Sequence, residues 1–194
     1  MDRGLTDSVE RFATRVGEAL ASAASGTSVE VARLRRDATV EAFSLCCALI
    51  DTDQRQTDDE LWALIAAFSR HGLLPGAATP SDIRDSSLVK GRRNWLQSPS
   101  EMFLTLSQVD EKRGTRLSRH YYDEAMALAH TVASLDRFPS DSELQAIVAF
   151  QRLLLASLPS IKPVASTSGM DEVGADGEAT APGDPADLPE EPPE

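Results

Sequence analysis

Apolar residues recur at three- and four-residue steps along most of the chain, which is the spacing of helices that bury one face. Val9, Phe12, Val16 and Leu20 begin this pattern. The period-two alternation of a strand is nowhere sustained over a useful length. The sequence therefore predicts an all-α fold of about seven helices, which begin near Asp7, Ser28, Thr57, Thr79, Ser98, Thr115 and Asp141.

A segment from Asp53 to Leu61 returns 83 residues later, from Asp136 to Leu144. The residues or types kept at this offset are Asp53 and Asp136, Thr57 and Ser140, Asp58 and Asp141, Glu60 and Glu143, Leu61 and Leu144, and Ala63 and Ala146. Each copy is an apolar helix, an acidic bend and a second helix. Such a unit cannot bury its apolar face alone, so we expect the two copies to pack together in one domain.

A hydroxyl residue followed three positions later by Glu opens the second helix of each copy. Thr57 with Glu60, and Ser140 with Glu143, fit the capping box, in which each residue satisfies a free N–H of the first turn. Ser98 and Glu101 show the same spacing, with a proline between them. We therefore predict a third capping box there, and a short helix after Thr79 with Pro80 at its first position.

The acidity of the chain is concentrated at its end. The whole sequence has a net charge of -12, but the segment after Lys162 contains nine acidic residues and no Lys or Arg. This segment is also rich in Pro, Gly, Ser and Ala, and it has too few large apolar residues to form a core. The sequence therefore predicts a helical domain over residues 1–160 and a disordered acidic tail over residues 161–194.

Secretion and membrane signals are absent from the pattern. Acidic residues interrupt the first twenty positions, and no apolar run approaches the length of a membrane span. We expect a cytoplasmic protein with no membrane partner. The two cysteines, Cys46 and Cys47, are sequence neighbours that point in different directions on a helix, so we interpret both as small buried apolar residues.

The repeated helix-bend-helix pattern resembles the TerB-like domains of tellurite-resistance and stress-response proteins, which are helical and internally repeated. The segments 58–68, 89–96 and 121–130 also resemble the N-terminal helical region of actinobacterial AAA-type ATPases of the SpoVK or CbbX kind. This resemblance implies a linker that leads to an ATPase module. No G-x-x-x-x-G-K-[ST] phosphate loop occurs in the chain, so ATP hydrolysis is not predicted for it.

Acidic residues of the two bends are the candidate metal ligands. The TerB resemblance implies metal binding through such acids, and the candidate ligands are Asp51, Asp53, Asp58, Glu60, Asp136, Asp141 and Glu143. A calcium loop starting at Asp51 lacks the required Gly at its sixth position and has Trp62 where a bidentate Glu belongs. Helix capping explains the same carboxylates without a metal, so no cofactor is expected under the main interpretation.

Basic residues in the middle of the chain are the candidate contacts for a partner. The basic candidates are Lys90, Arg92, Arg93, Arg116 and Arg119, and the aromatic Trp95 lies among them in the sequence. An acidic partner, a nucleotide or a nucleic acid would fit such a face, and a solvated surface would explain it equally well. Residues 1–162 carry a net charge of -3, which argues against nucleic acid.

Catalytic patterns are not found. His71, His120 and His130 are far apart in the sequence, and His130 is expected in the core. We therefore predict a non-catalytic protein-interaction or regulatory domain whose partner is an AAA-type ATPase or its assembly. The alternative is a TerB-like domain that senses metal or stress through its acidic bends.

Overall fold

The computed structural model describes residues 3–24, 28–75, 77–136 and 139–160. The described residues form seven α-helices and two short 3-10 helices and contain no strand, so the predicted all-α fold is confirmed. In chain order the elements are α1 (Arg3–Ala24), α2 (Ser28–Ile50), α3 (Asp58–Phe68), η1 (Ser69–His71), α4 (Pro80–Asp85), η2 (Arg92–Gln97), α5 (Glu101–Arg113), α6 (Leu117–Ala133) and α7 (Asp141–Ala156).

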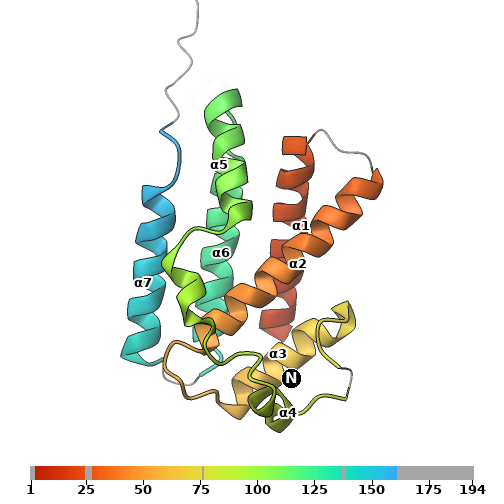
Figure 1. The fold of residues 1–194 in the computed structure, drawn as a ribbon, viewed down its shortest axis with the longest axis vertical. Helices are drawn as coiled ribbons and strands as arrows, with labels where there is room; N and C mark the ends of the chain where they lie inside the picture. The colour runs from red at the N-terminus through yellow and green to blue at the C-terminus, as the bar shows by residue number, and fades with distance from the viewer. Residues whose placement is uncertain (1–2, 25–27, 76, 137–138, 161–194) are drawn as a thin grey trace, which may run out of the picture. The chain divides into compact units, whose positions relative to one another are not determined.

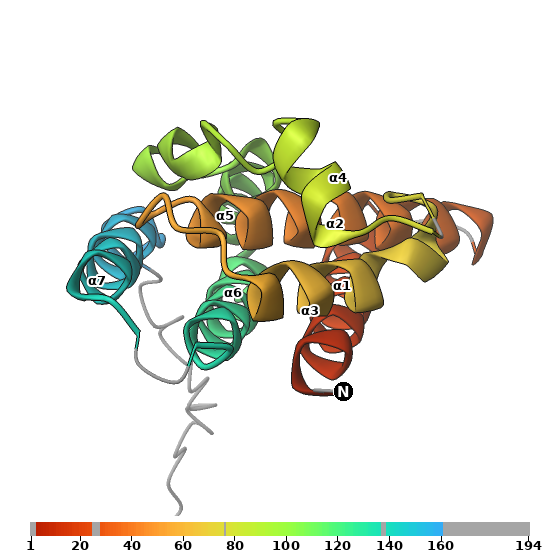
Figure 2. The ribbon, with the colours of Figure 1, turned by 90° about the horizontal axis from the view of Figure 1, so that it is seen from below.

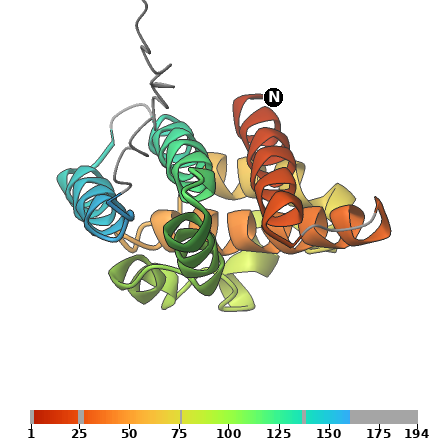
Figure 3. The same cartoon turned by 90° about the horizontal axis from the view of Figure 1, so that it is seen from above.

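Helix α2 is the element around which the others pack. Helices α1 and α6 lie side by side on one side of it, and α4 lies on the opposite side (Figures 1, 2 and 3). Helices α1 and α2 approach closely at Gly17, where an added Cβ would lie 2.9 Å from Arg35 Cα. Large buried side chains from several helices fill the centre, among them Phe12, Phe103 and Tyr121.

The two sequence copies are both built as predicted, α2–bend–α3 and α6–bend–α7. Thr57 and Ser140 are the N-caps of α3 and α7, and each forms the full capping box with the Glu three residues later. Thr79 caps α4 in the same way, with Pro80 at the first helical position.

Two of the predicted helix starts differ from the structure. The first helix begins at Arg3, because Leu5 is also fully buried and extends the apolar face by a turn. The predicted box of Ser98 and Glu101 is wrong. Ser100 is the N-cap of α5 and accepts a hydrogen bond from the Phe103 N–H, which leaves Glu101 as the first helical residue.

The structure confirms that both cysteines are buried, but the expected core position of His130 is wrong. Cys46 and Cys47 are buried and unpaired, and burial raises the pKa of both thiols, that of Cys47 to about 12. His130 is exposed on α6, because its position falls outside the face that packs on the other helices.

The chain divides by its contacts into a compact unit of Met1–Pro163 and a second unit of Val164–Glu194. The predicted acidic tail over residues 161–194 lies outside the described residues. None of the described helices combines the length and the apolar character needed to cross a membrane.

Candidate functional site

Glu60, Asp136 and Glu143 meet where the two acidic bends come together, and we call this cluster the acidic junction. Carboxylate oxygens from all three lie within 4.8 Å of one another. Thr57 joins the copies, because its Oγ1 lies 3.0 Å from an Asp136 carboxylate oxygen and 2.8 Å from one of Glu60. The junction therefore contains residues from both repeats, and neither copy could form it alone.

The junction concentrates negative charge in a buried place. Glu60 and Glu143 are almost fully buried, and Asp136 is partly exposed. Burial raises the pKa of Glu60 to about 7, and the nearby charges of Asp136 and Glu143 add to this rise, against the hydrogen bonds from Thr57. None of the three carboxylates makes an ion pair with a described residue. Three oxygen ligands at this spacing are chemically suited to a hard divalent cation.

The other four acidic candidates do not join this cluster. Asp51 is buried and accepts a hydrogen bond from the Arg93 N–H at 3.1 Å. Asp53 accepts from the Arg55 N–H at 2.8 Å, and Asp58 pairs with the Arg84 side chain. The remaining candidate, Asp141, is exposed in the first turn of α7.

The predicted basic face is divided among several places. Trp95 is partly buried, and its ring lies 6.2 Å from that of Phe150, so it belongs to the packing of η2 on α7. Arg119 pairs with Asp123 and lies over the Tyr122 ring at 4.6 Å. Arg116 precedes the first residue of α6, and Arg92 begins η2, where its charge acts on Cys47.

Lys90 and Arg93 line one hollow of about 530 Å³ together with Arg55 and Arg84, and we call it the basic hollow. Arg55 and Arg84 were not predicted, since they lie 35 and 6 residues before Lys90 in the sequence. Neither has a neighbouring basic residue that would mark it as part of a cluster. Only the folding of the bend and of α4 brings them to this place.

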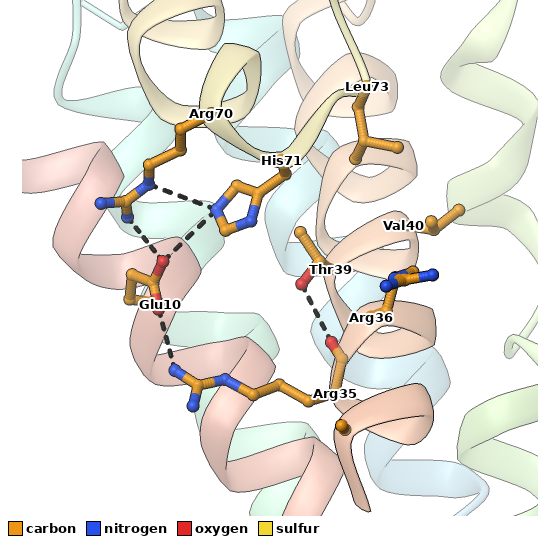
Figure 4. Close-up of a pocket in the computed structure, with 9 residues that line it drawn as sticks. Glu10, Arg35, Arg36, Thr39, Val40, Arg70, His71 and Leu73 are labelled. Carbon is orange, nitrogen blue, oxygen red and sulfur yellow. Dashed lines mark hydrogen bonds and ion pairs between the residues drawn. The ribbon is translucent and has the colours of Figure 1, made fainter. Parts of the chain in front are cut away.

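A second group of basic side chains surrounds Glu10 beside a hollow of about 360 Å³, shown in Figure 4. The Glu10 carboxylate forms ion pairs with Arg35 at 3.0 Å and with Arg70 at 2.7 Å. His71 Nε2 lies 3.3 Å from the same carboxylate. The cations here are already paired with the Glu10 carboxylate. The group therefore connects α1 to α2 and η1.

Apolar side chains are exposed along one side of α7. Leu144, Val148 and Leu155 are each more than two fifths exposed, and their spacing puts them on one face, which we call the α7 stripe. Apolar spacing alone does not separate these three residues from Ile147 and Phe150 of the same helix. The structure buries only the Ile147 and Phe150 side, because α7 packs at the edge of the domain against α6, α2 and η2 (Figure 3).

Comparison of the chain with protein-family models, curated proteins and solved structures found no match. The support for each candidate site is therefore the geometry of the described residues.

Proposed function

We propose that this protein is a non-catalytic protein-interaction domain, and that its α7 stripe receives an amphipathic helix of a partner protein. One observation carries the proposal. Leu61 and Ile65 in the first copy are buried, whereas Leu144 and Val148, which occupy the same positions of the second copy, are 46% and 43% exposed.

The first copy has a helix neighbour that the described residues do not show beside α7. Helix α1 packs against α3, and its own apolar side is fully buried through Leu5, Val9 and Phe12. The second copy has α6, α2 and η2 as the neighbours of α7. An amphipathic helix with apolar residues at three- and four-residue steps would cover the α7 stripe as α1 covers α3.

The resemblance to the N-terminal region of AAA-type ATPases supports a partner of that class. Crosslinking from α7 in the native host tests this assignment. A photoreactive amino acid replaces Leu144, and the control carries it at Glu111, an exposed position on α5. We expect a subunit of an AAA-type ATPase, identified by mass spectrometry, to be crosslinked from position 144 and not from position 111.

Affinity for the purified partner then tests the stripe itself. Val148→Asp puts a charge into the stripe, and Gln145→Asp puts the same charge on a neighbouring exposed position of α7 outside it. We expect Val148→Asp to weaken binding by roughly tenfold or more, because a buried unpaired carboxylate costs more than 1.4 kcal/mol. Equal affinity of the two variants would refute the docking face, and a partner of another class would refute only the ATPase assignment.

The acidic junction supports a second function, the binding of a divalent cation. Glu60, Asp136 and Glu143 would each supply one oxygen, and the cation's charge would oppose the burial and the repulsion that together raise the pKa of Glu60. Calorimetric titration with calcium, manganese and zinc tests this function. We expect Glu143→Gln to abolish a binding signal that Asp82→Asn retains, since Asp82 occupies the same capping-box position in α4 but belongs to no group of three possible ligands among the described residues. Flat traces for all three cations would exclude the site.

A further inference from the structure

The basic hollow contains more positive charge than its surroundings neutralise. Arg55, Arg84, Lys90 and Arg93 line it, and they come from the bend after α2, from α4 and from the segment before and within η2. Asp51 is the one acidic residue among the described residues that line it, and it is buried. Four positive charges therefore line the hollow with one carboxylate, and a second carboxylate, Asp58, pairs with Arg84 from outside the lining.

Three of these cations have no internal partner. Among the described residues, the side chains of Arg55, Lys90 and Arg93 make no hydrogen bond or ion pair. The group around Glu10 shows the opposite arrangement, because a carboxylate there already holds Arg35 and Arg70. The basic hollow therefore brings together three cations for which the described residues provide no ion-pair partner.

Several features hold the hollow in shape. Arg84 donates to the Gln56 carbonyl oxygen through two nitrogens, at 2.8 and 3.3 Å, and pairs with Asp58. Gln54 and Gly91 line the hollow in left-handed conformations, with φ of 63° and 84°. A left-handed residue other than glycine is uncommon, and such conformations are concentrated where the surrounding structure fixes a functional loop.

We propose that the basic hollow binds a compact anion made of linked phosphate groups. Guanidinium groups bind phosphate through paired, charge-assisted hydrogen bonds, and three of the four cations are arginines. The volume of about 530 Å³ is in the range of small-ligand sites. No aromatic side chain lines the hollow among the described residues, so the site offers nothing on which a base could stack.

The charge of the domain favours a small anion over a long one. Residues 1–162 have a net charge of -3, so an extended polyanion would be repelled beyond the hollow. Screening confines the attraction to about 8–10 Å at physiological salt, which matches a ligand that stays inside the hollow. This proposal is independent of the α7 stripe, which uses other residues.

Isothermal titration of the full chain with tripolyphosphate, pyrophosphate and inorganic phosphate tests the proposal. We expect affinity to rise with the number of linked phosphates and to fall as salt is added. Lys90→Ala/Arg93→Ala is expected to lose roughly tenfold or more in affinity for tripolyphosphate, since both charge-assisted partners of the phosphate groups are removed.

The matched control is Lys112→Ala/Arg113→Ala, which removes the same charge from the exposed end of α5. We expect it to bind tripolyphosphate like the natural chain, and circular dichroism checks that both double variants are folded. An equal loss in the control would overturn the site as non-specific charge attraction. Hexaglutamate binding as tightly as tripolyphosphate would overturn the assignment to phosphate, and the absence of any binding would overturn the proposal itself.

Discussion

Thr57 Oγ1 lies 3.0 Å from Asp136 Oδ1, a contact that spans 79 residues of sequence and joins the two copies of the repeat. The same hydroxyl caps α3 and lies 2.8 Å from Glu60 Oε2. Its single proton serves one carboxylate at a time, so the junction retains uncompensated negative charge. The consequence is a buried glutamate whose protonation is linked to folding.

The first prediction concerns the pH dependence of stability at Glu60. Its pKa is about 7 in the folded chain and 4.5 as the ordinary value, so between these values the folded state holds a proton that the unfolded state has lost. Stability is therefore expected to fall as the pH rises from about 4.5 to 7. Allowing for solvent screening at the partly exposed Asp136, we expect a loss of about 1–2 kcal/mol.

Urea unfolding of the natural chain and of Glu60→Gln at pH 5 and pH 7.5, in EDTA, measures this effect. The amide side chain of this variant keeps an oxygen for the Thr57 N–H but does not titrate, so the difference between the two proteins isolates Glu60. We expect the stability of Glu60→Gln relative to the natural chain to be higher at pH 7.5 than at pH 5. A stability difference that is the same at both pH values would contradict the prediction.

The second prediction concerns Asp110, a buried residue near the end of α5 that holds the start of α6. Its carboxylate accepts hydrogen bonds from the N–H groups of Leu117 and Ser118 and from the hydroxyls of Ser118 and Thr115. Burial opposes the charged form, but these hydrogen bonds outweigh it and lower the pKa of Asp110. This contribution is present above the ordinary pKa of 3.8 and is lost as the pH falls through the lowered value.

At neutral pH, Asp110→Ala leaves buried N–H and O–H donors without acceptors and is expected to cost about 2–4 kcal/mol. Glu111→Ala is the control, because Glu111 is the exposed neighbour on the same helix and should cost less than about 0.5 kcal/mol. Urea unfolding followed by circular dichroism compares the two. Similar losses in both variants would show that α6 does not depend on this cap.

The third prediction concerns Gly17, a position of close approach between α1 and α2. A Cβ at this position would lie 2.9 Å from a backbone atom of Arg35, so the helices must move apart to accept it. Gly17→Ala is expected to destabilise the domain by about 1–2 kcal/mol, although alanine is the better helix former by about 1 kcal/mol. Ser22→Ala, at an exposed position of α1, serves as the control in the same thermal melt, and a stabilised Gly17→Ala would contradict the close packing.

The candidate sites differ in how far the sequence could predict them. Glu60, Asp136 and Glu143 were among the seven acidic candidates, because the repeat marked both bends. Which three would meet depended on the packing of the bends, since Asp141 is exposed and Asp51 binds the Arg93 N–H. Lys90 and Arg93 were predicted from their local cluster, whereas Arg55 and Arg84 are separated from it in the sequence.

Local chemistry by itself determined the helices, their main caps and the duplication, because apolar spacing and capping residues act within a few positions of one another. The same spacing marks Leu144, Ile147 and Val148 alike as apolar positions of one helix. Only the tertiary structure decided that Leu61 is buried and Leu144 exposed, since this depends on which helix packs beside each copy. Burial on a particular side of a helix requires a neighbour, and the identity of that neighbour is a property of the whole fold.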